Sequence, residues 1–151
     1  MSHSLAKVTI HLVFSTKGRK PWLRDPVVQQ ELHAYMATIL RDNVDSPALV
    51  INGVEDHIHA LISLSRKQAI MNVVKKAKTE TSKWLKRRTD NNAFSWQGGY
   101  GAFSVSESNI AQVRRYIEHQ QEHHQRMSYQ DEMRALCQRH EINLDERYAW
   151  D

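Results

Sequence analysis

The chain has 151 residues, a formal net charge of +4 at pH 7, and one cysteine. This length predicts a single domain over residues 1–151 that buries a core of its own. The lone cysteine, Cys137, excludes an intrachain disulfide and a metal cage built from thiolates. The sequence has no run of about 18 apolar residues and no apolar leader segment, so we expect a cytoplasmic protein without a membrane partner.

Basic residues gather in one part of the chain. Nine lysines and arginines lie from Arg66 to Arg88, and the only acid among them is Glu80. Such a run is typical of a surface that binds a polyanion, although a solvated helix face can have the same composition. The candidate polyanion contacts that we select are Lys75, Lys76, Lys83 and Arg87 in this run, with Lys17 and Arg19 in an earlier loop.

A loop rich in glycine and aromatic residues follows the basic run, and it contains Phe94, Trp96 and Tyr100. Exposed aromatic side chains beside a basic helix can stack on unpaired bases, at about 1–3 kcal/mol per base. The same side chains are equally suited to closing the end of a core, and the sequence leaves both interpretations open.

The hydrophobic periodicity predicts the order strand, helix, strand, strand, helix, strand and two further helices. The strands cover residues 7–14, 48–54 and 102–105 and a segment that contains His57, and the first two helices cover residues 26–41 and 69–88. Asp25 and Ser128 are typical of helix N-caps. This order indicates an α+β, ferredoxin-like fold of split βαβ units. We expect an antiparallel four- to five-stranded sheet with helices on one face, plus a C-terminal helix that carries Tyr116.

Two histidines separated by one residue lie in the stretch from Glu55 to Leu64. Side chains alternate along a β-strand, so His57 and His59 point to the same face, about 7 Å apart at the backbone, while Ile58 faces a core. Two imidazoles in this arrangement can converge on one metal ion. Polar residues on the wet face of a half-buried strand give the same pattern, so the pair alone is half of a metal site.

A second group of candidate residues lies on the helix that follows the last strand. Tyr116 and Gln120 are four residues apart and therefore on one side of that helix. A phenol is a poor nucleophile at neutral pH because its pKa is about 10, and a nearby divalent cation favours the phenolate and neutralises charge on a phosphate. A phosphotyrosine ester keeps the bond reactive, so a free 3′-hydroxyl can reverse the step without ATP. Tyr116 is also compatible with a boundary aromatic packed beside Val113 and Ile117.

Together these residues resemble a known family. His-Ile-His at residues 57–59, followed by an apolar strand, is similar to the histidine-hydrophobe-histidine motif of the HUH endonucleases. Tyr-Ile-Glu-His-Gln at residues 116–120 resembles the tyrosine helix of the small single-tyrosine HUH transposases of bacterial insertion sequences. Residues 11–17 and 99–106 are similar to that family's first strand and to its approach to the tyrosine helix.

The resemblance implies a single HUH-type transposase domain that cuts and rejoins single-stranded DNA at the ends of a mobile element. His57, His59 and Gln120 would hold Mg²⁺ or Mn²⁺, and Tyr116 would attack the phosphate to give a 5′-phosphotyrosine and a free 3′-hydroxyl. Two imidazoles ordinarily suit a softer metal than Mg²⁺. Family members are typically homodimers that recognise DNA hairpins, with the tyrosine helix of one subunit completing the histidine site of the other.

Two positions depart from the family pattern: Glu55-Asp56 stands where a proline-asparagine pair is common, and Gly18 where an aromatic is frequent. Three alternatives stay open at this stage. One is a nucleic-acid-binding module without catalysis, and another is a metallohydrolase that uses water in place of Tyr116. The third is a host-adopted relative that acts on chromosomal repeats.

Overall fold

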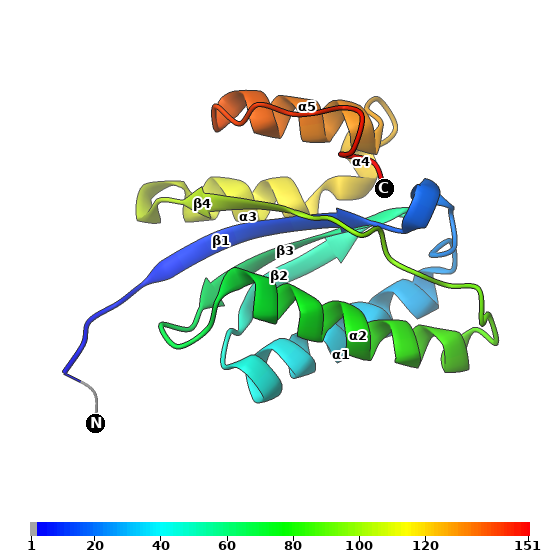
Figure 1. Ribbon diagram of the computed structural model, residues 1–151, viewed down its shortest axis with the longest axis horizontal. Helices are drawn as coiled ribbons and strands as arrows, with labels where there is room; N and C mark the ends of the chain where they lie inside the picture. Colours follow the sequence, from blue (N-terminus) through cyan, green and yellow to red (C-terminus); the bar gives the residue numbers. More distant parts are fainter. Residues whose placement is uncertain (1–2) are drawn as a thin grey trace.

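The computed structural model describes residues 3–151 and has a four-stranded antiparallel sheet in the order β2-β3-β1-β4 (Figure 1). The strands are β1 (Val8–Ser15), β2 (Ala48–Gly53), β3 (His57–Leu64) and β4 (Gly101–Val105). The helices are α1 (Pro26–Val44), α2 (Ile70–Arg88), α3 (Ile110–Glu118), α4 (Gln120–His123) and α5 (Tyr129–Arg139), with short 3-10 helices at Lys17–Arg19 and Glu107–Asn109. β3 lies between the parallel strands β1 and β2, so the predicted split βαβ fold is confirmed.

One face of the sheet packs on α1 and α2 and holds the larger core. The even-numbered residues of β1 and β3 point to this face, because side chains alternate along a strand. Leu12, Phe14, Ile58 and Ile62 are at most 1% exposed there. The Asp25 carboxylate caps α1 by accepting from the Val27 backbone N–H at 2.9 Å, as the sequence predicts.

The opposite face of the sheet is covered by α3, α4 and α5, which form a second helical layer (Figure 1). The expected helix that carries Tyr116 belongs to this layer, and α4 and α5 extend it. α5 is attached by a smaller core in which Met133, Leu136 and Cys137 pack towards Val13 of β1 and Phe103 of β4. Odd-numbered residues of β1 and β3, the histidines among them, therefore lie between the sheet and α3–α5.

The tyrosine helix has a break that the sequence pattern does not predict. α3 ends at Glu118, His119 has φ −106° and ψ 28°, and α4 begins at Gln120. The Asn52 side chain amide, on edge strand β2, donates to the Ile117 carbonyl at 2.9 Å, which satisfies a carbonyl at the end of α3. This bond holds the C-terminal end of α3 against the sheet.

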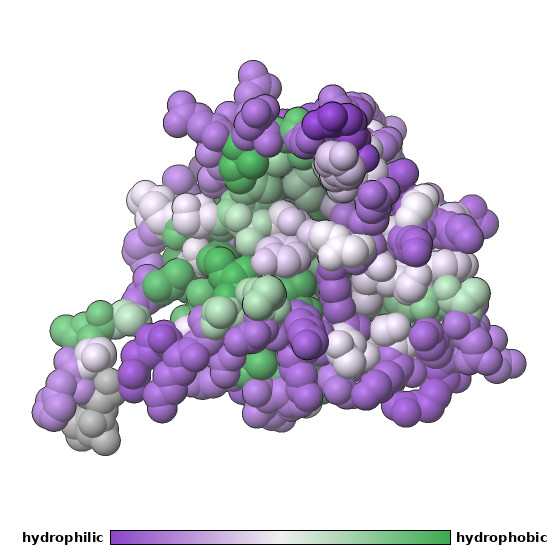
Figure 2. All heavy atoms as spheres, viewed as in Figure 1, coloured by the Kyte–Doolittle hydropathy of each residue, from purple (hydrophilic) through white to green (hydrophobic). Residues whose placement is uncertain are grey.

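The aromatic residues of the loop after α2 differ in burial, so the sequence's two interpretations, core closure and exposure for base stacking, apply to different residues. Phe94 and Trp96 are 2% and 7% exposed and belong to the larger core, whereas Tyr100 is exposed. Figure 2 shows apolar atoms in the middle of one face, between the α5 layer and the α2 layer, with hydrophilic residues above and below. Among the described residues, no helix has the length and apolar character that crossing a membrane requires.

Candidate metal centre and tyrosine

His57 and His59 are fully buried at the start of β3, beneath the second helical layer. The Nδ1 atom of each ring has a partner outside the pair. His57 Nδ1 lies 2.6 Å from Asp56 Oδ1, and His59 Nδ1 lies 2.7 Å from His11 Nε2. Both Nε2 atoms therefore face the space between the sheet and α5. Asp56, one of the departures from the family pattern, orients a candidate ligand, which is the usual role of a group beside a metal-binding imidazole.

His124 and Glu132 complete a cluster of four candidate ligands, whose ligating atoms all lie within 4.8 Å of one another. Glu132 Oε1 lies 2.9 Å from His59 Nε2, 3.0 Å from His124 Nε2 and 3.2 Å from His57 Nε2. Three imidazoles thus converge on one carboxylate oxygen. His124 follows α4 and Glu132 lies on the first turn of α5, so the C-terminal part of the chain supplies half of the cluster.

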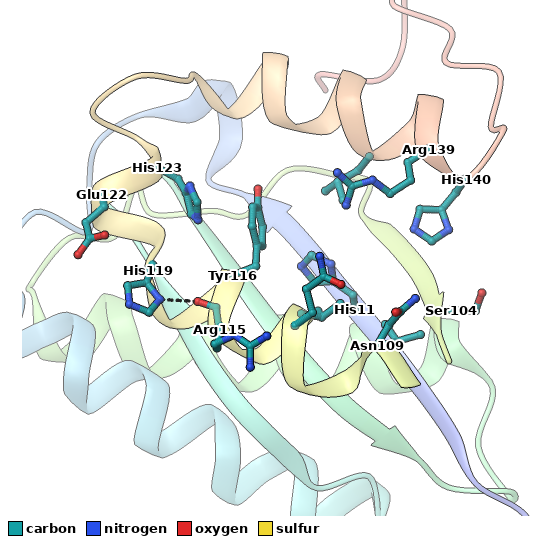
Figure 3. Close-up of a pocket in the computed structure, with 14 residues that line it drawn as sticks. His11, Ser104, Asn109, Arg115, Tyr116, His119, Glu122, His123, Arg139 and His140 are labelled. Atoms are coloured by element: carbon teal, nitrogen blue, oxygen red, sulfur yellow. Dashed lines mark hydrogen bonds between the residues drawn. The ribbon is translucent and has the colours of Figure 1, made fainter. Parts of the chain in front are cut away.

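Tyr116 projects from α3 towards α5 (Figure 3). Its phenol donates a hydrogen bond to Oε2 of Glu132. Its ring centroid is 6.0 Å from that of His59 and 4.6 Å from that of His123. The tyrosine and the histidine pair therefore meet within one chain. A second tyrosine, Tyr129, also lies near the cluster, but its hydroxyl donates to Gln97 Oε1 at 2.7 Å and not to a member of the cluster.

Gln120 is brought to the same place despite the helix break. It is fully buried, and its Nε2 donates to the Tyr116 carbonyl at 3.4 Å. Its Oε1 is the one buried side-chain oxygen or nitrogen without a hydrogen-bond partner among the described residues. An unpartnered buried oxygen ordinarily costs free energy, so such a group calls for an explanation such as a missing ion or water. The role of Gln120 as a metal ligand stays a prediction.

The electrostatics of the cluster keep the phenol neutral. Burial opposes ionisation of Glu132, but hydrogen bonds from His124, His57 and His59 outweigh it and hold its pKa well below the usual range. Burial, together with the negative charge of Glu132, raises the pKa of Tyr116 above its usual value. A phenolate at this position therefore needs an additional positive charge beside it.

The pKa values of the histidines shift in different directions because their partners differ. Burial disfavours charge on His57, but its hydrogen bonds to Asp56 and Glu132 outweigh burial and raise its pKa. Burial lowers the pKa of His59 to about 4, against the opposing effect of Glu132, and lowers that of His11 to about 3. His59 and His11 are consequently neutral at pH 7, the form in which imidazole ligates a metal.

The candidate polyanion contacts fall into two places. The candidate contacts on α2 are Lys75, Lys76, Lys83 and Arg87. α2 packs on the sheet face opposite α3, the helix that carries Tyr116 (Figure 1). Lys17 and Arg19 lie in the 3-10 helix after β1, where the Arg19 guanidinium donates to the Trp150 carbonyl at 3.1 Å. The α2 residues therefore cannot contact a phosphate that lies at Tyr116, and their DNA contacts stay a prediction for another part of a nucleic acid.

The sequence matches the family model described as "Transposase IS200 like" over residues 4–120, which is well over half of the chain. The chain belongs to the IS200-like transposase family. The match includes the histidine pair, Tyr116 and Gln120, and it ends before His124 and Glu132. A search of curated protein sequences found no match.

Two solved structures share the fold of this IS200-like transposase. A provisionally described transposase from Deinococcus radiodurans R1 superposes with a TM-score of 0.63 at 23% identity, covering 80% of this chain and 95% of that one. A REP-associated tyrosine transposase bound to a REP hairpin superposes with a TM-score of 0.56 at 13% identity, covering 79% of this chain and 72% of that one. At these identities the likeness establishes the fold.

The structure of this IS200-like transposase brings together four residues that the sequence motifs predict, namely His57, His59, Tyr116 and Gln120. Two further members of the cluster, His124 and Glu132, lie outside those motifs. His124 is one of several histidines near the end of α4, and Glu132 is one of two acids in the first turn of α5, so neither stands out in the sequence. No spacing rule links either residue to β3. Only their residue types could have indicated them, since a histidine and an acid that follow a tyrosine motif are candidate metal ligands.

Proposed function

We propose that this IS200-like transposase cuts and rejoins single-stranded DNA through a covalent bond to Tyr116, with a divalent metal beside it, as one HUH-type domain over residues 1–151. The observation that supports this most directly is the hydrogen bond from the Tyr116 phenol to Glu132, whose other oxygen meets His57, His59 and His124. The nucleophile and the candidate metal ligands are neighbours within one chain.

In the proposed step the Tyr116 Oη atom forms a bond to phosphorus and the bond from phosphorus to the 3′ oxygen breaks. The phenol loses its proton, the departing oxygen gains one and becomes a 3′-hydroxyl, and the 5′ end stays on the protein as a phosphotyrosine ester. Attack by a free 3′-hydroxyl on this ester reverses each of these changes. Cutting and joining therefore need one active site and no ATP.

The residues fit a divalent metal. The two strand imidazoles present Nε2 with Nδ1 already engaged, His124 and Glu132 add a nitrogen and a carboxylate, and Gln120 offers an unpartnered oxygen. When bound, the metal would favour the phenolate and neutralise charge on the phosphate. Mg²⁺ and Mn²⁺ are the ions that the family resemblance implies, and a set with three imidazoles favours Mn²⁺ of the two.

The proposed partner is single-stranded DNA with hairpin ends, and the family resemblance adds a homodimer with exchanged tyrosine helices. The relative bound to a REP hairpin supports a hairpin ligand for this chain. Because Tyr116 reaches the histidine cluster of its own chain, exchange would require the α3–α4 segment to leave the Asn52 contact. Cleavage by the chain's own Tyr116 is therefore the simpler arrangement.

The test is a search for the covalent adduct. Denatured single strands of the DNA that flanks the gene, labelled at the 5′ or 3′ end, are incubated with the protein and Mn²⁺ and run on a denaturing gel. We expect a protease-sensitive band that carries the 3′-end label, and a released 5′-labelled fragment that a polymerase can extend. Tyr116→Phe should give neither product, whereas Tyr129→Phe, which removes the other hydroxyl near the cluster, should give both.

Each rival predicts a different result in this assay. A metallohydrolase would cut with Tyr116→Phe and leave no protein on either fragment. A binding module would retain the strands without cutting them in any metal. Either result would refute the proposal. A host-adopted relative would form the same adduct on strands from chromosomal repeats, so strands of both origins belong in the assay.

A further inference from the structure

A cavity of about 750 Å³ lies beside Tyr116, between α3 and α5, and no member of the four-residue cluster lines it. Tyr116 rises into it from α3, and Arg139 descends from α5 on the opposite wall, with Arg115 and His140 nearby (Figure 3). The volume falls within the range of about 300–1,000 Å³ that is usual for sites that hold small organic ligands. Neither the family motifs nor the metal cluster accounts for this space.

Two arginines give the cavity its charge. Among residues 3–151, no carboxylate lies within 4.0 Å of the guanidinium group of Arg115 or Arg139. Each of the two helices also carries an arginine that is paired: Arg114 on α3 lies 3.2 Å from Glu118, and Arg134 on α5 lies 2.6 Å from Glu146. Of the described residues that line the cavity, Glu122 is the one acid. Unpaired guanidinium groups that face a cavity favour a phosphate ligand, which they can bind through two parallel hydrogen bonds.

The remaining wall suits a nucleobase. Val113 and Leu136 provide an apolar surface, and the rings of Tyr116 and His140 provide faces on which a flat heterocycle can stack. Side-chain amides from Asn109 and Gln112 can both donate and accept hydrogen bonds at a base edge. The mixture of unpaired cations, apolar surface and amides matches one nucleotide unit, whereas a purely apolar ligand would leave the arginines unsatisfied.

A second cavity, of about 590 Å³, is lined by both Tyr116 and Glu132. The two cavities share a wall that includes Tyr116, His123 and Arg139. A chain of nucleotides that entered one cavity and left through the other would pass Tyr116, with Arg139 beside it. Two adjacent cavities that both have Tyr116 in their walls favour a strand over a free nucleotide.

We propose that the larger cavity binds one nucleotide of the DNA single strand next to the phosphate that Tyr116 attacks, with Arg139 and Arg115 holding its phosphate groups. This inference rests on the proposed function, since it assigns a substrate subsite to the same tyrosine. It gives α5, which lies outside the family match, a second task besides supplying Glu132: its last turn carries Arg139 over the strand.

The test measures binding without catalysis. Fluorescence anisotropy with an unstructured single-stranded octanucleotide in EDTA separates strand binding from metal use and from bond cleavage. Each cavity arginine has a matched control on its own helix, so Arg139→Gln is compared with Arg134→Gln, and Arg115→Gln with Arg114→Gln. We expect a Kd about tenfold higher for each cavity variant and less than twofold higher for each control. The salt slope should fall by about 1 for each lost phosphate contact.

A cavity-filling variant, Gln112→Trp, tests the space itself at an exposed lining position. We expect it to weaken octanucleotide binding while its thermal unfolding temperature stays within 2–3 °C of the wild-type value, roughly the effect of 1 kcal/mol or less. Equal effects of the cavity and control arginines, or unchanged binding by Gln112→Trp, would overturn the proposal. A deoxynucleoside monophosphate that binds more tightly than the octanucleotide would also overturn it, in favour of a free-nucleotide site.

The two proposals fail separately. If the tyrosine adduct forms but Arg139→Gln binds and reacts as the wild type does, the subsite assignment is wrong and the proposed function stands. If Arg139→Gln loses strand binding in EDTA while no adduct forms on any DNA, the subsite stands and the tyrosine chemistry is wrong.

Discussion

Replacing Glu132 by glutamine tests whether an ionised carboxylate organises the centre of this transposase. Glu132 is 1% exposed and meets three imidazoles and the Tyr116 phenol. Glutamine keeps the shape and removes the charge. A hydrogen bond to a charged group contributes about 1.5–3 kcal/mol and one between neutral groups about 0.5–1.5 kcal/mol, so each imidazole contact loses about 1 kcal/mol. We therefore expect Glu132→Gln to lower the free energy of unfolding by about 3 kcal/mol without metal.

The assay is urea denaturation in EDTA at pH 7, with Glu118→Gln as the control. Glu118 is an exposed partner of Arg114, and removing such a pair should cost about 0.5 kcal/mol or less. The pKa of Glu132 is lowered in the folded state, so its contribution is fully present above its unfolded value of about 4.3 and is lost as the pH falls. The difference between wild type and Glu132→Gln should therefore shrink below about pH 4.3.

The same variant should change two other properties of the centre. The pKa of Tyr116 should fall, because one cause of its increase is the negative charge of Glu132, but burial should keep it above the usual value. An NMR titration of ¹³Cζ-labelled tyrosine reports this change. Mn²⁺ should also raise the unfolding temperature of Glu132→Gln less than that of the wild type. A stability change below 0.5 kcal/mol with an unchanged Tyr116 pKa would show that Glu132 is not ionised against the imidazoles.

Three further predictions concern other parts of the molecule. Burial lowers the pKa of His33 on α1 to about 4, so the free energy of unfolding decreases as the pH falls from 6.5 towards 4. In His33→Gln this decrease should be smaller by up to about 3 kcal/mol, which denaturation in EDTA at pH 6.5 and at pH 4 measures. A Cβ on Gly53 would lie 2.4 Å from the backbone oxygen of His57, so Gly53→Ala should cost about 1–3 kcal/mol and weaken Mn²⁺ binding measured by calorimetry, whereas Gly98→Ala should do neither. The third prediction concerns glutamine at four positions of α2: Lys75, Lys76, Lys83 and Arg87. These changes should weaken hairpin binding and flatten its salt dependence, yet leave octanucleotide binding unchanged. Equal losses of affinity for both ligands would contradict the placement of α2 behind the sheet.

The basic residues of α2 and the arginines of the cavity can contact different segments of one DNA molecule, which the sequence does not reveal. The α2 lysines and the cavity arginines lie on opposite sides of the sheet, so one DNA backbone segment cannot meet both. A hairpin with a single-stranded extension has two such segments. The net charge of the chain describes their sum, whereas the fold decides which charges can act on the same phosphate.

Local periodicity was enough to predict the fold and half of the centre. Alternation along β3 places His57 and His59 on one face and Ile58 on the other, and a spacing of four keeps Tyr116 and Gln120 together even across the break at His119. These are relations between residues a few positions apart, which backbone geometry fixes wherever the segment lies. The order of the elements then predicted the split βαβ sheet, because few arrangements of such a chain can bury one core.

Only the tertiary structure decided what meets the histidine pair. Glu132 reaches His59 across 73 positions, and His124 reaches His57 across 67. Nothing in the local pattern indicates that α5 folds back over the sheet, because its attachment to Val13 and Phe103 depends on how apolar surfaces from distant segments fit together. Sequence alone therefore determined which chemical groups share a face, and packing between segments determined which groups lie opposite them.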